Sequence, residues 1–293
     1  MFKIKKYIPD IVVAIILIAG IGLLAYPTIG DYINALHSSK AIGSYVEKTK
    51  DLSKEEKENL LREAREYNES LVGKVNRYYL NEEEKKRYAH ILDITKTGIM
   101  AYVEIPKLNI YMPVYHGTDE GVLQIAAGHL PGSSLPVGGE NTHSLISGHR
   151  GLPSAKLFTD IDKLKKGDLF FIHVFDEVLA YKVNQIKIVL PDDVETLEIE
   201  KGKDYVTLIT CTPYGVNSHR LLVRGTRTEY VEEEKSNDTI PQKLAQTDPK
   251  KVLAAGSAVL VILILLVYLI VRRNGKRRVS GGKEEAEKSG KEN

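Results

Sequence analysis

The chain has 293 residues, 43% of them hydrophobic, and its mean hydropathy of −0.20 is that of an ordinary soluble protein. That average hides two uncharged stretches of 20 residues, one between Asp10 and Asp31 and one between Lys251 and Arg272. Each is long enough to cross a bilayer, whose hydrocarbon core needs about 20 helical residues. A purely cytosolic enzyme is therefore not expected.

The net charge of +2 is unevenly distributed along the chain. Residues 1–10 carry +2 and residues 272–293 carry +4, which leaves −4 for everything between them. Because the region between the two ends is acidic overall, it offers no basic surface for nucleic acid, and no nucleic-acid partner is expected. The single cysteine cannot form an intrachain disulfide, and the chain needs none even if its centre lies outside the cell.

The first apolar segment, residues 11–30, follows the basic end at residues 1–10, which is expected to stay in the cytoplasm. It predicts either a transmembrane helix or signal anchor, or a cleaved signal peptide. The segment has no clear small-x-small cleavage site and is longer than a usual signal core. An uncleaved helix is therefore favoured.

The second apolar segment, residues 252–271, leads into a basic cluster that should also remain inside the cell. We predict a second transmembrane helix here; the alternative is a core helix buried in a domain large enough to enclose it. Residues 272–293 predict a basic, disordered cytoplasmic tail. With both basic ends inside, residues 31–251 are expected on the extracellular side of the cell membrane.

Residues 31–97 are predicted to form a helical spacer. Ser53 followed by Glu56 is a capping-box pattern that marks a helix start. Apolar side chains then recur at helical spacing, at Leu60, Leu61, Ala64, Tyr67 and Leu71. The segment is either a solvated spacer or a regulatory element.

From Gly98 the pattern changes to short β-like runs that are broken by Gly, Pro and Asn. The runs are IMAYVEIP, LNIYMPV, HSLIS, DLFFIHV, VLAYKVNQIKIVL, YVTLITC and RLLVRGTR. Seven or eight such strands over residues 98–230 predict a closed β-barrel or a sandwich. Residues 231–251 are polar and contain proline, which predicts a linker into the second apolar segment.

Cys211 ends one of these runs and precedes a turn that contains Pro and Gly. A lone cysteine is by default a small buried hydrophobe, but a strand end that leads into a loop is where side chains reach substrate. If the next run pairs with this one as a hairpin, Arg220 lies near Cys211 and can favour a thiolate or stabilise an oxyanion. Arg224 shares the strand face of Arg220, so spacing alone does not choose between the two arginines.

His149 lies in SLISGHRG, where a β run meets a glycine-bounded turn. Histidine can protonate a leaving amine and then deprotonate an incoming one. Seven other histidines compete for this role, namely His37, His90, His116, His129, His143, His173 and His219. The chain has no close histidine pair and its only thiol is isolated, so neither a metal site nor a cofactor is expected.

Together these residues resemble the sortase family, and specifically the class C, pilus-assembling sortases. The T-L-x-T-C signature at Cys211 is followed nine residues later by Arg220, and S-G-H-R-G lies upstream. The resemblance runs from Tyr67 to Gly225, and is dense in TGIMAYVEIPKL, in the region from VYHGTDEG to DKLKKGD, and in VTLITCTPYGVNSHRLLVRG.

The resemblance implies a mainly β fold, an eight-stranded sortase-type β-barrel at residues 98–230. A helical N-terminal segment would precede the barrel, and two transmembrane helices would flank it. It further implies that Cys211 is the nucleophile, His149 the general acid and base, and Arg220, rather than Arg224, the residue that stabilises the oxyanion and substrate.

The implied activity is that of a membrane-anchored cysteine transpeptidase. It would cleave an LPXTG-type sorting signal between Thr and Gly through a thioacyl intermediate and join the product to a lysine amine of a pilin. The expected partners are pilins or surface proteins that carry sorting signals, and a lysine-bearing acceptor pilin. Three alternatives stay open: a housekeeping-type sortase that attaches surface proteins to cell-wall precursor, a non-catalytic scaffold that binds sorting signals, and a hydrolytic cysteine protease.

One departure from the family concerns the lid. Many class C sortases carry an Asp-Pro-aromatic motif before the barrel, whereas the only Asp-Pro pair here is Asp248-Pro249, beyond it. By position alone, Tyr78 or Tyr79 is the candidate lid aromatic, and a solvated spacer is the alternative.

His129 and His143 lie in family-like stretches, AAGHLPGSSLP and ENTHSLIS. They are candidates for rim packing or for hydrogen bonds to substrate in the binding groove.

Overall fold

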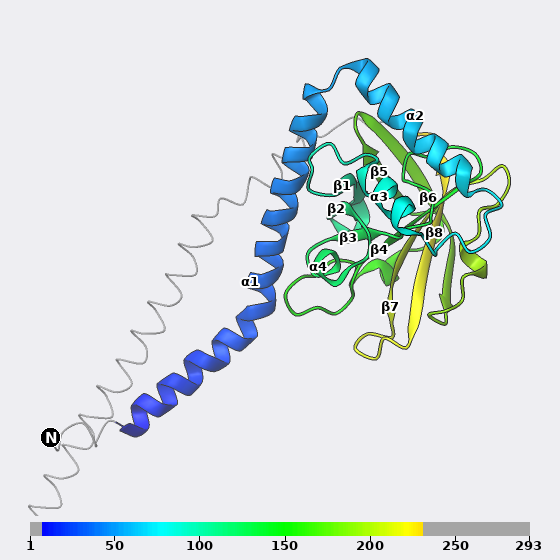
Figure 1. Ribbon diagram of the computed structural model, residues 1–293. Helices are drawn as coiled ribbons and strands as arrows, with labels where there is room; N and C mark the ends of the chain where they lie inside the picture. The colour runs from blue at the N-terminus through cyan, green and yellow to red at the C-terminus, as the bar shows by residue number, and fades with distance from the viewer. Residues whose placement is uncertain (1–7, 231–293) are drawn as a thin grey trace, which may run out of the picture. The chain divides into compact units, whose positions relative to one another are not determined.

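The computed structural model describes residues 8–230. Residues 1–7 of the predicted basic end lie outside the described residues, as do the predicted linker (231–251), second transmembrane helix (252–271) and tail (272–293). The described residues comprise three longer helices followed by a closed eight-stranded barrel (Figure 1). The predicted fold class, a β-barrel after a helical segment, is confirmed for this part of the chain.

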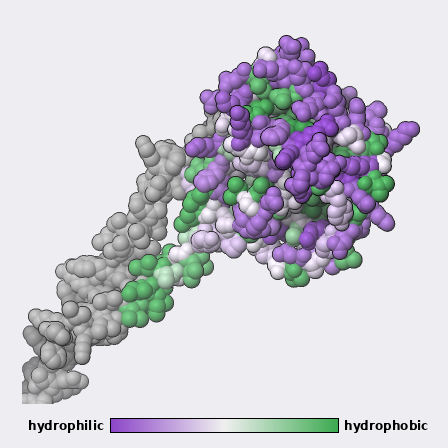
Figure 2. All heavy atoms as spheres, in the orientation of Figure 1, coloured by the Kyte–Doolittle hydropathy of each residue, from purple (hydrophilic) through white to green (hydrophobic). Residues whose placement is uncertain are grey.

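Helix α1, Ile8–Asp51, is a single 44-residue helix with Pro27 in its interior. Its part Ile15–Asp51 is long enough, and contains a stretch apolar enough, to cross a membrane, and none of that stretch is buried. Figure 2 shows apolar residues gathered along the N-terminal part of α1. The predicted first span therefore does not end at a helix terminus but continues as helix into the spacer. The compact unit that holds the barrel begins at Pro27.

Two shorter helices follow, α2 at Lys54–Leu71 and α3 at Glu82–His90. The predicted capping box is present, because the Ser53 hydroxyl accepts from the Glu56 amide and the Glu56 carboxylate accepts from the Ser53 amide. A second capping box joins Asn81 and Glu84. Of the predicted positions, α2 buries Leu61, Ala64, Tyr67 and Leu71, whereas Leu60 is only partly buried. Asn68, which was not predicted, is buried as well.

The eight strands form a closed barrel in the order β1-β2-β3-β4-β7-β8-β6-β5 (Figure 1). Their bounds are β1 Ile99–Ile105, β2 Ile110–His116, β3 Ala127–His129, β4 Thr142–Ser147, β5 Leu169–Val174, β6 Glu177–Val189, β7 Asp204–Thr212 and β8 His219–Thr228. Short helices lie between strands, namely η2 Pro106–Leu108, α4 Glu120–Leu123, η3 Ile161–Lys163 and η4 Glu195–Leu197. The pairs β2–β3 and β4–β7 are parallel, and the other pairs are antiparallel.

Alternation along β7 gives the barrel wall two distinct faces. Val206 and Leu208 point into the main core, whereas Ile209 belongs to a second cluster on the opposite, outer face. We call this second cluster the outer patch. It consists of Leu145, Leu197, Ile209 and Leu222, with Tyr78, Leu130 and Val189 packed against it.

The second half of α1 packs against the barrel through side chains three or four residues apart. These are Ser38, Ile42, Tyr45 and Thr49, all buried. The Tyr45 hydroxyl donates to the Met100 carbonyl (3.1 Å) and accepts from the Phe175 amide (3.0 Å). These two bonds fix α1 to β1 and to the β5–β6 turn.

Candidate active site

Cys211 and Arg220 are register partners on β7 and β8, beside the turn that joins these strands. The predicted hairpin is therefore confirmed. Both residues share the strand face of the outer patch, because Ile209 precedes Cys211 by two residues and Leu222 follows Arg220 by two. Cys211 is partly exposed. The Arg220 guanidinium donates to the carbonyls of Asn217 and His219 within its own turn, each at 3.2 Å.

The parallel pairing of β4 with β7 brings His149 to the same place. Ser147 pairs with Ile209, the Gly148 amide donates to the Ile209 carbonyl (3.0 Å), and the Thr210 hydroxyl donates to the Gly148 carbonyl (2.7 Å). His149 directly follows Gly148, and Cys211 directly follows Thr210, so the β4–β7 pairing brings both residues to the same end of the barrel. The three residues predicted from sequence therefore converge at one end of the barrel.

His149 is partly buried, and its side chain is 27% exposed. Its Nε2 atom lies 3.8 Å from a carboxylate oxygen of Glu120, which begins α4 and is exposed. Within the described residues Nε2 is itself buried and makes no hydrogen bond. Glu120 was not singled out from sequence, because nothing in its surroundings marks it as a neighbour of a residue 29 positions away.

Arg150, which directly follows His149, is a second residue near the site that was not predicted from the sequence. Its guanidinium pairs closely with Asp162, donates to the Thr212 hydroxyl (3.4 Å), and lies 5.9 Å from the centroid of the Tyr214 ring. It thereby ties the turn that carries His149 to the turn that follows Cys211. The available signal was its position next to the histidine in S-G-H-R-G.

Arg224 shares the face of Arg220 but makes different contacts. Its guanidinium donates to Asn184 (3.2 Å) and Glu200 (3.0 Å), and lies 4.1 Å from the centroid of the Tyr205 ring. Through these contacts the Arg224 side chain is bound to β6, β7 and the β6–β7 connection. Among the described residues Arg220 donates only to carbonyls of its own turn, which leaves it better placed to receive a substrate oxygen.

The side chains of His129 and His143 are fully buried. His143 on β4 contacts the Glu198 carbonyl (2.9 Å) and the Thr207 hydroxyl (2.7 Å). Burial lowers the pKa of His143 to about 4 and that of His129 to about 3. Of the two roles predicted for these histidines, the geometry supports packing, because neither ring is accessible to a substrate.

The two candidate lid tyrosines occupy different environments. Tyr79 is 84% exposed, whereas Tyr78 is partly buried and packs against the outer patch. The preceding Arg77 is buried; its guanidinium donates to the Tyr78 hydroxyl and to the Leu197 carbonyl, each at 2.7 Å, and pairs with Glu198 (3.3 Å). The segment before α3 is thus fastened to the β6–β7 connection.

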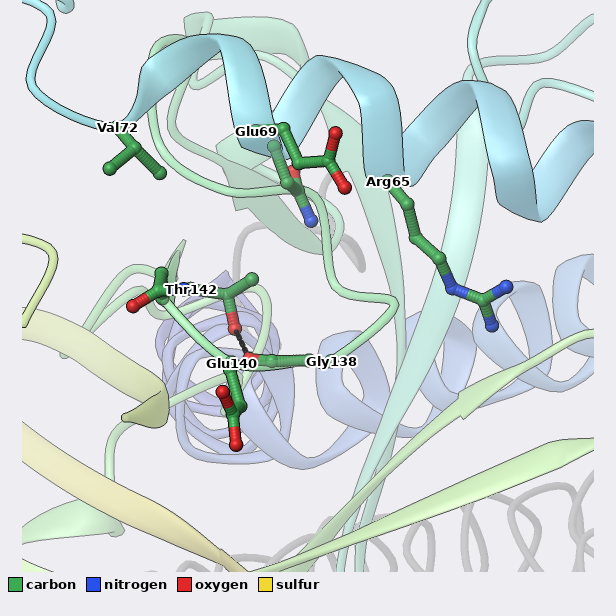
Figure 3. A pocket seen from close by; sticks show the side chains of 9 residues that line it. Arg65, Glu69, Val72, Gly138, Glu140 and Thr142 are labelled. Atoms are coloured by element: carbon green, nitrogen blue, oxygen red, sulfur yellow. Dashed lines mark hydrogen bonds between the residues drawn. The ribbon is translucent and has the colours of Figure 1, made fainter. Parts of the chain in front are cut away.

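The surface is hollowed beside this segment and also at a separate place. One hollow of about 730 Å³ lies between residues 73–79, Leu130 and the β6–β7 connection, beside Tyr78. The other, about 300 Å³, lies between α2 and the β3–β4 connection, where Arg65 and Glu69 stand opposite Glu140 and Thr142 (Figure 3). The second hollow contains none of the three converging residues, so it belongs to a different part of the surface.

Comparison with known proteins identifies the barrel. A family model described as the sortase domain matches residues 103–228. Sortase A of Bacillus anthracis is 31% identical over 132 residues, which are 45% of this chain and 61% of that protein. Sortase A of Staphylococcus aureus is 34% identical over 123 residues, 41% of this chain and 58% of that protein. The aligned region thus spans about 60% of the length of these curated relatives.

Solved structures match over a larger part of the chain. Sortase C1 of Streptococcus agalactiae is 49% identical, with a TM-score of 0.64, over 66% of this chain and 100% of that one. Sortase C of Streptococcus pneumoniae is 48% identical, with a TM-score of 0.59, over 65% of this chain and 97% of that one. Both are class C enzymes, as the sequence resemblance predicts.

Proposed function

Since the chain belongs to the sortase family, we propose that it is a cysteine transpeptidase that cleaves an LPXTG-type sorting signal between Thr and Gly. The observation that carries the proposal is the register pairing of Cys211 with Arg220, with His149 delivered beside them by the parallel β4–β7 pair. A nucleophile, a general acid and an anion-stabilising group are the parts that acyl transfer needs.

In the first half-reaction the Cys211 thiolate attacks the Thr carbonyl carbon. Arg220 stabilises the negative charge that develops on the carbonyl oxygen. His149 donates a proton to the glycine amine as the C–N bond breaks, which leaves a thioester on Cys211. The Nε2 atom of His149 makes no hydrogen bond among the described residues, so it is not committed to another group.

In the second half-reaction a lysine amine of another pilin attacks the thioester. His149 accepts a proton from this amine, an isopeptide bond forms, and Cys211 leaves as thiolate. The choice of a pilin acceptor rests on similarity to class C enzymes, among them the Streptococcus pneumoniae sortase C studied for its pilin substrate specificity and sortase C1 of Pilus Island 1 of group B streptococcus.

We further propose that α1 anchors the enzyme in the cell membrane, with the barrel on the extracellular side. The support is the length and unburied apolar stretch of this helix, together with the basic residues that precede it. Membrane attachment suits the proposed reaction, because it keeps the enzyme where membrane-borne precursors of surface proteins arrive.

The test is incubation of the full chain in detergent with an LPXTG-bearing pilin and a lysine-bearing acceptor. Cys211→Ala is the control. We expect isopeptide-linked ladders with the wild-type chain and none with the variant. Attachment only to a cell-wall precursor would instead identify a housekeeping-type sortase. Truncated pilin without ladders would identify a hydrolase, and binding without cleavage would identify a scaffold.

A further inference from the structure

His149 is the second residue of a loop, residues 148–158, that leaves β4 and returns to the core. We call it the His149 loop. Its base is closed by a hydrogen bond from the Phe158 amide to the His149 carbonyl (3.1 Å). Leu152 and Ala155 form an isolated bridge inside it, and Ala155, Leu157 and Phe158 are buried. The tip, at Pro153 and Ser154, is not anchored in the core.

Helix α1 contacts this loop at the point where its apolar segment ends. The Lys156 amide donates to a carboxylate oxygen of Asp31 at 2.8 Å. One residue earlier, Gly30 lies so close to the loop that a Cβ at this position would stand 2.8 Å from the Ser154 carbonyl oxygen and 3.0 Å from the Ser154 Cα. Both atoms belong to backbone, so an alanine here would have to push the helix and the loop apart.

Other glycines of the same helix lack such a neighbour. A Cβ at Gly43 would meet no atom within 4 Å. The close approach at Gly30 is therefore a property of this contact and not of glycine in α1. Fifteen residues after Gly30, Tyr45 fixes α1 to β1 and the β5–β6 turn. The part of α1 that contacts the His149 loop is therefore continuous with a part that is bonded to the barrel.

We propose that Gly30 and Asp31 are positioning residues for His149. By holding residues 154–156, the turn of α1 at the end of the apolar segment sets the conformation of the His149 loop and hence the placement of the imidazole against Cys211. This inference rests on the proposed function for its catalytic consequence.

The proposal is tested on the full chain in detergent with four variants. Gly30→Ala introduces the clash, and Asp31→Ala removes the hydrogen-bond acceptor. Gly43→Ala makes the same chemical change as Gly30→Ala in the same helix without a contact, and Asp31→Asn keeps an oxygen acceptor at the same position. Amide hydrogen exchange of Lys156 and Phe158 and the kinetics of peptide cleavage are measured for each.

Gly30→Ala and Asp31→Ala should speed exchange at both amides and lower kcat on the order of tenfold, because small displacements of a reacting group are costly. Their KM should stay at the wild-type value, because neither residue lies on the strand face that carries Cys211 and Arg220. Gly43→Ala and Asp31→Asn should match the wild-type chain in both measurements. Because a loss of folded enzyme also lowers the apparent kcat at unchanged KM, kcat is calculated per folded enzyme, which a loss of stability alone would leave unchanged.

Exchange rates equal to the wild-type values in Gly30→Ala and Asp31→Ala would overturn the proposal, because the contact would not hold the loop. Faster exchange with an unchanged kcat would overturn it as well, because the loop would not position His149. If the wild-type chain cleaved no sorting peptide, the proposed function would fail. The exchange measurement would then still decide whether α1 holds the loop.

Discussion

Cys211 and Arg220 face each other across the β7–β8 hairpin, while Arg224, on the same strand face, is bound to Asn184 and Glu200. Arg220→Ala should therefore lower kcat on the order of 10²- to 10³-fold, the usual cost of removing an oxyanion donor. Arg224→Ala should instead act on stability and leave kcat of the folded enzyme near the wild-type value. Steady-state cleavage of a sorting peptide, alongside thermal unfolding, measures both. A larger loss of kcat in Arg224→Ala would contradict the assignment.

The Cys211–Arg220 pairing could be predicted from sequence because it is local. Two alternating runs separated by a Pro- and Gly-containing turn have one simple pairing, and the register follows from it. The capping box at Ser53 is equally local. Both are patterns in which the interacting groups lie a few residues apart.

The approach of His149 to Cys211 could not be derived in this way and came only from the family resemblance. It depends on a parallel pairing of β4 with β7, between segments some sixty residues apart, and alternation does not say which strands pair. Strand β3 is three residues long and leaves no periodic signal. The Gly30–Ser154 contact could not be predicted either, because it joins segments far apart in the sequence and one glycine in an apolar helix does not indicate its contact partner.

Tyr78, rather than Tyr79, is expected to limit access to Cys211, because Tyr78 packs against the outer patch whereas Tyr79 is 84% exposed. Tyr78→Ala should accelerate the reaction of Cys211 with a bulky methanethiosulfonate reagent severalfold. Tyr79→Ala removes an identical ring from the adjacent position and should leave the rate unchanged. Equal rates in the two variants and the wild-type chain would exclude a lid role for this segment.

If Tyr78 acts as a lid, Arg77 is expected to hold it in place. It is buried and bridges Tyr78 to the Leu197 carbonyl and Glu198. Arg77→Ala should reproduce the accelerated labelling of Cys211 that is expected for Tyr78→Ala. The double variant should add little to either single one, because both act on the same contact. Additive effects on the logarithm of the labelling rate would show that the two residues restrain Cys211 independently.

Tyr45 joins α1 to the barrel through two hydrogen bonds made by one buried hydroxyl. Tyr45→Phe keeps the ring but leaves the Phe175 amide and the Met100 carbonyl without this partner, which should cost about 1–3 kcal/mol of stability. The measurement is the change in thermal unfolding of the full chain in detergent. Tyr79→Phe, at an exposed ring, is the matched control and should have no effect.

The stability of the barrel should fall in mild acid because of His143. Burial lowers its pKa from 6.5 to about 4 in the folded chain, so between these values the unfolded chain binds a proton that the folded chain does not. The free energy of unfolding should therefore decrease as pH falls from about 6.5 to about 4, by up to about 1.4 kcal/mol per pH unit for this group. Below about pH 4 both states are protonated and the contribution becomes constant.

His129 should add a similar slope that extends to about pH 3, where its lowered pKa lies. His143→Gln retains hydrogen-bonding groups toward Thr207 and the Glu198 carbonyl but cannot titrate. It should flatten the pH dependence between about 6.5 and 4, whatever its effect on stability at neutral pH, while the part that His129 contributes persists. Urea unfolding across this pH range measures the slope. If His143→Gln kept the full wild-type slope, the acid sensitivity would have to arise from other groups, and the buried neutral state inferred for His143 would be wrong.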